Sequence, residues 1–144
     1  SLPGLRLGYA VAHPERLQRW QQWRDPWSVN ALAVAAAQAV LPDKPFQHQT
    51  WSWLKAARTQ LFQDLTRLPE LQPYRGAANF FLVKSKQPGS QVQAKLLQSS
   101  QILIRDCLSF PELGDCYFRV AIRSASENQR LIAGLAQVLQ SLQR

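Results

Sequence analysis

Three arginines lie inside or at the end of apolar, strand-like sequence: Arg105, Arg119 and Arg123. A guanidinium is rarely buried without an anionic partner, and its planar fork matches the geometry of carboxylates and phosphates. Arg119 and Arg123 share a face of one strand but lie about 13 Å apart, too far to bind the same small anion. One could bind a carboxylate while the other meets a phosphate, an acidic side chain or solvent. The alternative is a half-exposed strand whose polar face points at water.

The sequence offers no other pattern that a known chemistry requires. It has no Ser-His-Asp set, no glycine-rich phosphate loop and no carboxylate pair at a telling spacing. The only histidines and cysteines, His13, His48, Cys107 and Cys116, do not have zinc-ligand spacing, so we expect no metal site. We expect reduced thiols, although a strand pairing that brings Cys107 near Cys116 leaves an incidental disulfide open.

The composition is that of an ordinary globular domain with a packed core. The chain has 144 residues, of which 46% are hydrophobic and 18% charged, and a formal net charge of +8. This charge requires an anionic partner to be considered: nucleic acid, anionic lipid or a phosphorylated metabolite. The longest apolar stretch, residues 29–41, is well short of the ~20 residues that span a bilayer, and no signal-peptide pattern is present. We therefore expect a cytoplasmic protein with no membrane partner.

Apolar periodicity predicts the elements that position the arginines. Ser28 is expected to cap a helix, and the Ser124-x-x-Glu127 pattern predicts a capping box at the start of the last one. The expected strands are 7–12, 79–83, 102–104 and 117–123, and the expected helices are 14–24, 29–41, 46–68, 89–99 and the segment after Ser124. The last two strands are expected to form an antiparallel pair. This order predicts an α/β fold of the two-layer α+β type.

Several segments resemble one family, the class I/II (fold type I) aminotransferases that depend on pyridoxal phosphate. Residues 3–9 (Pro-Gly-Leu-Arg-Leu-Gly-Tyr) resemble the segment that follows the family's Schiff-base lysine. Residues 79–83 (Asn-Phe-Phe-Leu-Val) resemble its ANF-L-V strand, and residues 117–123 its carboxylate-binding strand. Residues 27–30 and 104–110 are most similar to the threonine-phosphate decarboxylases of cobalamin biosynthesis, which are close relatives of the histidinol-phosphate aminotransferases.

The resemblance implies a role for five residues. Arg6 matches the arginine that binds the phosphate of the cofactor, pyridoxal 5'-phosphate, and Arg119 matches the arginine that binds the substrate's α-carboxylate. Arg105 and Arg123 have no certain family role, and we place them, as a hypothesis, near the distal phosphate of a phosphorylated amino-acid substrate. Asn30 opens the helix that leads into the small domain, where it either lines the active-site mouth or packs the turn.

The resemblance also implies an incomplete enzyme. Residues 1–27 would end the large cofactor-binding domain and residues 28–144 would form the C-terminal small domain, with the helix 28–41 as connector. The Schiff-base lysine would fall upstream of Ser1, so the chain alone would hold no catalytic residue and would be inactive. Family members are homodimers, and the parent would be a lyase or a transferase, with the decarboxylase favoured over the aminotransferase.

Two interpretations from other classes stay open beside this one. The first is a basic nucleic-acid-binding module that uses Trp51, Trp53 and Phe80 as stacking groups. Those aromatics fit helix and strand core positions better, so we expect no nucleic-acid partner. The second is a structural or regulatory domain with no site of its own.

Overall fold

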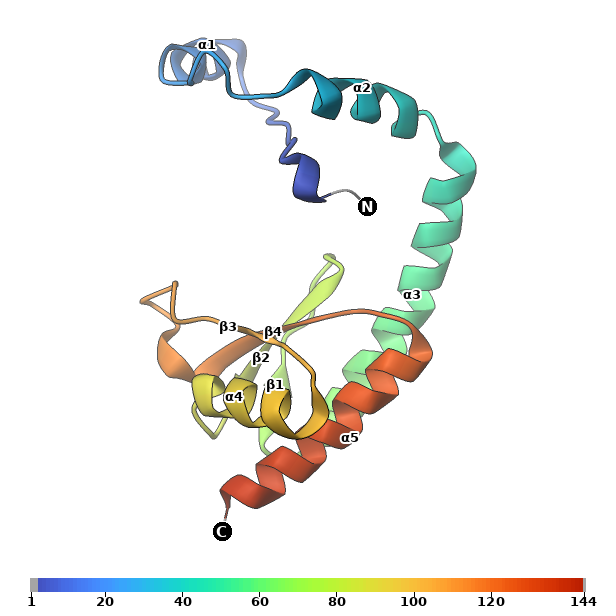
Figure 1. The fold of residues 1–144 in the computed structure, drawn as a ribbon, viewed down its shortest axis with the longest axis vertical. Coiled ribbons are helices and arrows are strands. Elements are labelled where there is room, and N and C mark those ends of the chain that lie inside the picture. The colour runs from blue at the N-terminus through green and yellow to red at the C-terminus, as the bar shows by residue number, and fades with distance from the viewer. Residues whose placement is uncertain (1–2, 144) are drawn as a thin grey trace. The chain divides into compact units, whose positions relative to one another are not determined.

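The computed structural model describes residues 3–143, which divide into two compact units between residues 49 and 50 (Figure 1). The first unit contains the short 3₁₀ helix Pro3–Leu5 and the helices α1 (Pro14–Gln22) and α2 (Ala31–Val40). The division falls inside α3 (Lys44–Thr66). A domain boundary between residues 27 and 28 therefore stays a prediction.

The first unit buries almost nothing on its own. Among its described residues only Ala33 is buried, whereas Tyr9, Trp23 and Trp27 are 94%, 81% and 93% exposed. Several large apolar side chains exposed on one small unit often mark a surface that other protein surfaces cover. The unit thus presents apolar surface that its own residues do not bury.

Two details of the first unit correct the sequence prediction. Residues 7–12 are irregular and not a strand, because a strand exists through hydrogen bonds to a neighbour and the described part of this unit contains no strand. The cap of α2 is Asn30 and not Ser28: the Asn30 side chain accepts a hydrogen bond from the Ala33 N–H at 2.8 Å. The helix accordingly runs from Ala31 to Val40, shorter than predicted.

The second unit is built on a four-stranded sheet in the order β1-β2-β4-β3, with every neighbouring pair antiparallel. In β2, Phe80 pairs with Ala121 of β4 and Leu82 pairs with Arg119. In β3, Arg105 pairs with Arg119. The strands are β1 (Leu71–Pro73), β2 (Phe80–Ser85), β3 (Arg105–Asp106) and β4 (Tyr117–Ala121).

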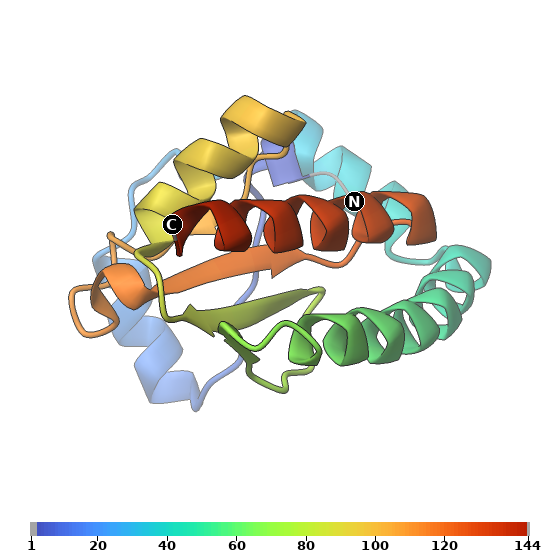
Figure 2. The same cartoon turned by 90° about the horizontal axis from the view of Figure 1, so that it is seen from below.

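Helices cover only one face of this sheet. The core lies between that face and the inner sides of α3, α4 (Gly89–Ser100) and α5 (Ala125–Leu142), and Figure 2 shows α4 and α5 side by side over the strands. The core includes Leu61, Leu65, Phe81, Val83, Val92, Leu96, Phe118, Val120, Ile122, Leu131, Leu135, Val138 and Leu139. The alternate strand residues are half-buried or exposed: Phe80, Leu82, Lys84, Tyr117, Arg119 and Ala121. The predicted two-layer α+β architecture is confirmed, and the helices of the second unit leave the other face of the sheet uncovered.

Most elements of this unit match the sequence prediction, and three details do not. Residues 102–104 are irregular, because the Gln93 side chain donates to the Ile104 carbonyl at 2.7 Å and takes that oxygen away from strand pairing. The short strand β1 was not predicted, since Pro73 reads as a breaker, yet at a sheet edge a proline is tolerated. The strand predicted over residues 117–123 ends at Ala121.

The capping box and the reduced thiols are both confirmed. Ser124 and Glu127 exchange the two hydrogen bonds of the box at the start of α5. Cys107 is buried and Cys116 is exposed, and both are free thiols. The incidental disulfide does not form.

Gly89 sets how closely α4 approaches β4. A Cβ at this position would lie 2.7 Å from the carbonyl oxygen of Tyr117, a backbone atom that cannot rotate away. We expect Gly89→Ala to lower the free energy of unfolding by about 1–3 kcal/mol, the usual cost of overpacking. Denaturant unfolding of the wild type and of the Gly89→Ala variant measures this difference. Gly76→Ala is the control, since a Cβ there meets nothing within 4 Å; equal losses from both substitutions would contradict the packing account.

Candidate functional site

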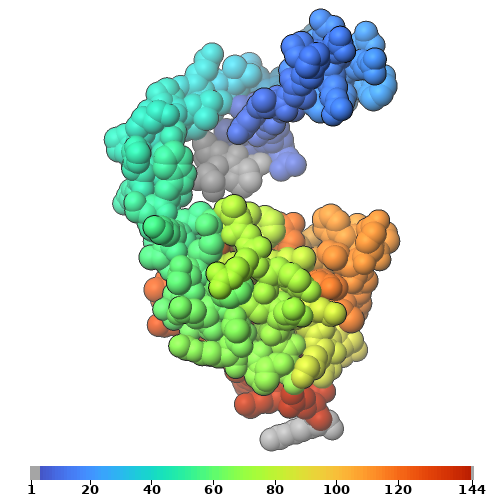
Figure 3. Space-filling view, turned by 180° about the vertical axis from the view of Figure 1, so that it is seen from behind, coloured from blue at the N-terminus to red at the C-terminus, as the bar shows by residue number. Residues whose placement is uncertain are grey.

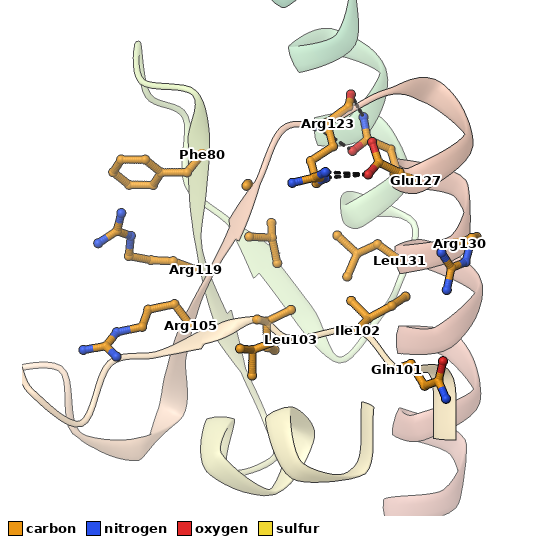
Figure 4. A pocket seen from close by; sticks show the side chains of 14 residues that line it. Phe80, Gln101, Ile102, Leu103, Arg105, Arg119, Arg123, Glu127, Arg130 and Leu131 are labelled. Atoms are coloured by element: carbon orange, nitrogen blue, oxygen red, sulfur yellow. Dashed lines mark hydrogen bonds and ion pairs between the residues drawn. The ribbon is translucent and has the colours of Figure 1, made fainter. Parts of the chain in front are cut away.

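A cavity of about 420 Å³ lies beside β4, where residues 101–104 separate from that strand (Figure 4). It is the place in the second unit where the three arginines singled out by the sequence come together. Arg105 and Arg119 extend from neighbouring strands on one side, together with Phe80, while Arg123 and Glu127 lie on the side of α5. Apolar side chains such as Ile102 and Leu131 line the space between them.

Arg119 is held by an aromatic ring. Its guanidinium carbon lies 3.9 Å from the ring centroid of Phe80, and both side chains stand on the open face of the sheet. Its Nε is buried and, among the described residues, finds no hydrogen-bond acceptor. Bidentate recognition of a carboxylate needs two N–H groups on one edge of the guanidinium. Because Nε is enclosed, the edge available to a carboxylate is the one formed by the two terminal nitrogens, Nη1 and Nη2.

Arg105 places a second positive charge opposite Arg119. The two residues form a direct pair in the β3–β4 register, an arrangement that is unfavourable for like charges unless an anion joins them. Within residues 3–143, no carboxylate lies at ion-pair distance from either guanidinium. The one hydrogen bond of the Arg105 side chain runs to the Ser109 hydroxyl at 3.4 Å, at the limit of the usual range. The pair therefore presents positive charge that this unit does not neutralise.

The carboxylate of Asp106, the residue that follows Arg105, already accepts hydrogen bonds within the unit. Asp106 accepts a hydrogen bond from the Leu108 N–H at 3.1 Å, and this bond is the main reason why its pKa lies below the usual value; Gln93 and the charge of Arg105 act in the same direction. The carboxylate therefore stabilises the turn after β3 and does not form an ion pair with Arg105. This leaves Arg105 available to an external anion.

Arg123 differs from the other two arginines because the chain supplies its partner. Its Nε and a terminal nitrogen contact the same oxygen of Glu127 at 2.8 and 2.6 Å (Figure 4). The hydrogen bond from Arg123, followed by those from Ser124, lowers the pKa of Glu127 to about 2. Arg123 and Arg119 thus have separate partners, as the strand spacing predicts. The ion pair reduces the positive charge that Arg123 offers to a ligand.

This ion pair stabilises the fold at neutral pH, and the contribution is expected to disappear at low pH. Because folding lowers the pKa of Glu127, its charged form stabilises the fold at neutral pH, and this contribution is lost as the pH falls from about 4.3 to about 2. We expect Glu127→Gln to be less stable than the wild type at pH 7 and to approach it below about pH 2. Thermal unfolding against pH measures the gap, with Glu112→Gln at an exposed acid as control. A gap independent of pH would contradict the assignment.

Cys107 and Phe80 complete the neighbourhood of Arg119. Burial raises the pKa of the Cys107 thiol, although the positive charge of Arg119 acts in the opposite direction. A neutral buried thiol is a packing group and not a nucleophile.

The sequence predicts Phe80 only as a core residue or as a stacking group for a nucleobase. Its contact with Arg119 depends on the β2–β4 register, which the sequence does not reveal.

Two further predicted site residues, Arg6 and Asn30, lie in the first unit. Arg6 is exposed and has a backbone φ of 54°, a left-handed conformation that is uncommon outside glycine. Such strain is often found where a side chain must point in a functional direction. Asn30 uses its side-chain oxygen to cap α2, which supports the packing alternative; a role at an active-site mouth is not tested.

Residues 3–143 contain no group of three or more His, Cys, Asp and Glu side chains placed to hold a metal ion. None of the helices in this part of the chain has the length and apolarity that crossing a bilayer requires. Trp51 and Trp53 are 59% and 43% exposed, which corrects the expectation that they belong to the core.

Comparison with known proteins assigns the family. The sequence model of the class I and II aminotransferases matches residues 1–135, and the chain belongs to that family. Threonine-phosphate decarboxylase from Salmonella typhimurium is 43% identical over 96% of the chain. Histidinol-phosphate aminotransferase from Methanothermobacter thermautotrophicus is 28% identical over 97% of the chain. In both comparisons the chain spans only 38% of the relative's length.

Solved structures agree with this family and with the fold. The histidinol-phosphate aminotransferase from Clostridium acetobutylicum matches 98% of the chain with a TM-score of 0.83 and 26% identity, and the match covers 43% of that protein. The L-threonine-O-3-phosphate decarboxylase from Porphyromonas gingivalis matches 96% of the chain with a TM-score of 0.72 and 29% identity, again over 43% of that protein. A further match at 26% identity, from Sinorhizobium meliloti, is a histidinol-phosphate aminotransferase in complex with pyridoxal-5'-phosphate.

Proposed function

We propose that this chain is the C-terminal part of a pyridoxal-phosphate-dependent enzyme that decarboxylates L-threonine O-3-phosphate in cobalamin biosynthesis. The observation that carries the proposal is the Arg105–Arg119 pair. Two guanidiniums stand opposite each other on an open sheet face without a carboxylate partner in the described chain, beside a cavity of about 420 Å³. A substrate with both a carboxylate and a phosphate carries two anionic groups that such a pair suits.

The roles of the arginines follow from their surroundings. Arg119 binds the α-carboxylate through its terminal nitrogens, since its Nε is enclosed. Arg105, more exposed and held only by Ser109, reaches the distal phosphate. Arg123 lines the same cavity but shares its charge with Glu127, so its contribution to phosphate binding is the smaller one.

The cofactor in this proposal is pyridoxal 5'-phosphate, which supplies an electron sink for bond cleavage at the substrate's Cα. Arg6 binds its phosphate, and the left-handed backbone at that residue fits such a role. Arg119 contributes by orientation: the direction in which it holds the carboxylate decides which bond at Cα is placed for cleavage. The orientation set by Arg119 would therefore decide whether the enzyme decarboxylates its substrate or transfers its amino group.

The choice of decarboxylation rests on the relatives. The decarboxylase from Salmonella typhimurium is 43% identical, against 28% for the aminotransferase from Methanothermobacter thermautotrophicus. The alternative activity is that of a histidinol-phosphate-type aminotransferase, which would use the same arginines. The nucleic-acid module loses one of its three stacking candidates, because the ring of Phe80 is in contact with Arg119.

The exposed apolar surface of the first unit supports a larger assembly. Trp23 and Trp27 are more than four-fifths exposed, and a homodimer of the complete enzyme would cover surface of this kind. We propose such a homodimer in the cytoplasm. The chain spans 38% of the length of two relatives that it matches, so we assign the proposed activity to the full-length enzyme and not to this chain alone.

Two parallel assays of the full-length enzyme test the proposed activity. The first measures carbon dioxide release from L-threonine O-3-phosphate, and the second measures amino transfer from L-histidinol phosphate to a 2-oxo acid. We expect the first reaction to proceed and the second to be negligible. The reverse result would assign the aminotransferase, and the absence of both would overturn the proposal.

A further inference from the structure

Among the described residues, the ring of Phe80 is the one strong contact that restrains the guanidinium of Arg119, to which we assign carboxylate binding. Phe80 pairs with Ala121 in the β2–β4 register, so its ring stands diagonally beside Arg119 on the same sheet face. At 3.9 Å from the ring centroid, the guanidinium is in direct contact with the aromatic face. The Arg119 Nε has no acceptor among the described residues, so no hydrogen bond fixes that end of the guanidinium.

The backbone that carries Phe80 is itself anchored on two sides. Arg58 of α3 donates from Nη2 to the carbonyl oxygens of Ala77 and Ala78, at 2.6 and 3.0 Å. These are residues of the loop that leads into β2, and this loop lies beside α3 (Figure 3). On the other side, the Asn79 carbonyl accepts a hydrogen bond from the Ile122 N–H at 2.9 Å. The ring of Phe80 therefore starts from a fixed backbone.

We propose that Phe80 is a positioning residue, which fixes the orientation of the Arg119 guanidinium and thereby selects the bond that is cleaved, with Arg58 holding the strand end that carries the ring. This inference rests on the proposed function, in which Arg119 binds the α-carboxylate. A guanidinium with one face against a ring cannot tilt freely, and its exposed edge then points in one direction. Without the ring of Phe80, the charge of Arg119 still attracts the substrate carboxylate, but the orientation of that carboxylate is no longer fixed.

The inference predicts a particular pattern of losses. In Phe80→Leu, affinity for L-threonine O-3-phosphate falls by about tenfold, the order expected for a partly desolvated cation–π contact. When a 2-oxo acid is present to accept the amino group, the fraction of turnovers that end in amino transfer, with loss of the Cα proton in place of carbon dioxide, rises above that of the wild type. Affinity for the decarboxylated product, 1-aminopropan-2-yl phosphate, stays unchanged, because that ligand has no carboxylate for Arg119 to bind.

The experiment compares Phe80→Leu and three further variants of the full-length, cofactor-loaded enzyme with the wild type. Phe80→Tyr keeps the aromatic face and should restore both affinity and product ratio. Phe110→Leu makes the same change at a ring outside the cavity and should behave as the wild type. Arg58→Gln removes the anchor and should shift the product ratio in the same direction as Phe80→Leu. Unchanged binding of the product shows that each variant is folded with its phosphate site intact.

The outcomes separate this inference from the proposed function. If the wild type decarboxylates L-threonine O-3-phosphate but Phe80→Leu keeps both its affinity and its product ratio, the positioning role is wrong and the function stands. If Phe80→Leu weakens the binding of substrate and product equally, the ring is merely structural and the inference is also overturned. If the wild type neither binds nor converts the substrate, the proposed function fails, and the inference fails with it.

Discussion

Replacement of Arg119 by alanine is expected to reduce kcat/KM for L-threonine O-3-phosphate by roughly a thousandfold. The variant gives up two charge-assisted hydrogen bonds to the carboxylate, each worth about 1.5–3 kcal/mol. Arg119→Lys keeps the charge but offers neither the planar fork nor the stacked contact with Phe80, so we expect only a partial recovery. Steady-state kinetics of the full-length enzyme with each variant measures the effect.

The decisive control for Arg119 is a ligand without a carboxylate. Affinity for 1-aminopropan-2-yl phosphate should change little in Arg119→Ala, because only the phosphate and the amino group of that ligand remain to be bound. Equal losses of affinity for substrate and product would instead mean that Arg119 stabilises the site as a whole. In that case the assignment of this arginine to the carboxylate would be wrong.

Replacement of Arg105 by alanine is expected to remove preference for the phosphorylated substrate. A phosphate retains about two negative charges near neutral pH, and the loss of a bidentate guanidinium should cost roughly a hundredfold in affinity. L-Threonine, which lacks the phosphate, should bind equally well to the variant and to the wild type. Arg123→Ala should have a smaller effect, since the charge of Arg123 is shared with Glu127.

Competition binding with the two amino acids measures the Arg105 effect directly. Arg67→Ala serves as the matched control, because that arginine follows α3, pairs with Asp64 of the helix and does not line the cavity. An Arg105 variant that still prefers L-threonine O-3-phosphate by the wild-type margin would exclude this residue as the phosphate ligand.

The sequence predicted the helices of the second unit well, because their apolar periodicity decides which faces are buried. The long helix expected over residues 46–68 is α3 (Lys44–Thr66), and the capping box at Ser124 starts α5 as predicted. The strands were harder to predict, because a strand depends on partners that are distant in sequence. Residues 7–12 have strand composition but no strand to pair with in the described part of their unit, and residues 102–104 lose a pairing oxygen to Gln93.

The site was predictable in its residue types but not in its contacts. Arginines in apolar strands identified Arg105 and Arg119, and the structure places them opposite each other in register. The Arg123–Glu127 pair was within reach of sequence reasoning, since the two residues are one helical turn apart at a capping box. The Phe80 contact was not, because it depends on a register between strands that are joined only through α4 and β3.

Together, these observations describe a small domain whose open sheet face presents two uncompensated guanidiniums. One is fixed by an aromatic ring and the other is exposed and weakly held. This difference suits a rigid carboxylate contact that sets reaction geometry and a more adaptable contact to a distal phosphate. Specificity and bond selection would then lie in different residues of the same cavity.

The most direct test of the account is a single-turnover measurement on the full-length, cofactor-loaded enzyme mixed with L-threonine O-3-phosphate. Carbon dioxide release and the absorption spectrum of the cofactor are followed together. The account predicts one carbon dioxide per substrate consumed and a cofactor spectrum that returns to its starting form. Conversion of the cofactor to pyridoxamine phosphate without carbon dioxide would contradict the proposed decarboxylase and identify an aminotransferase instead.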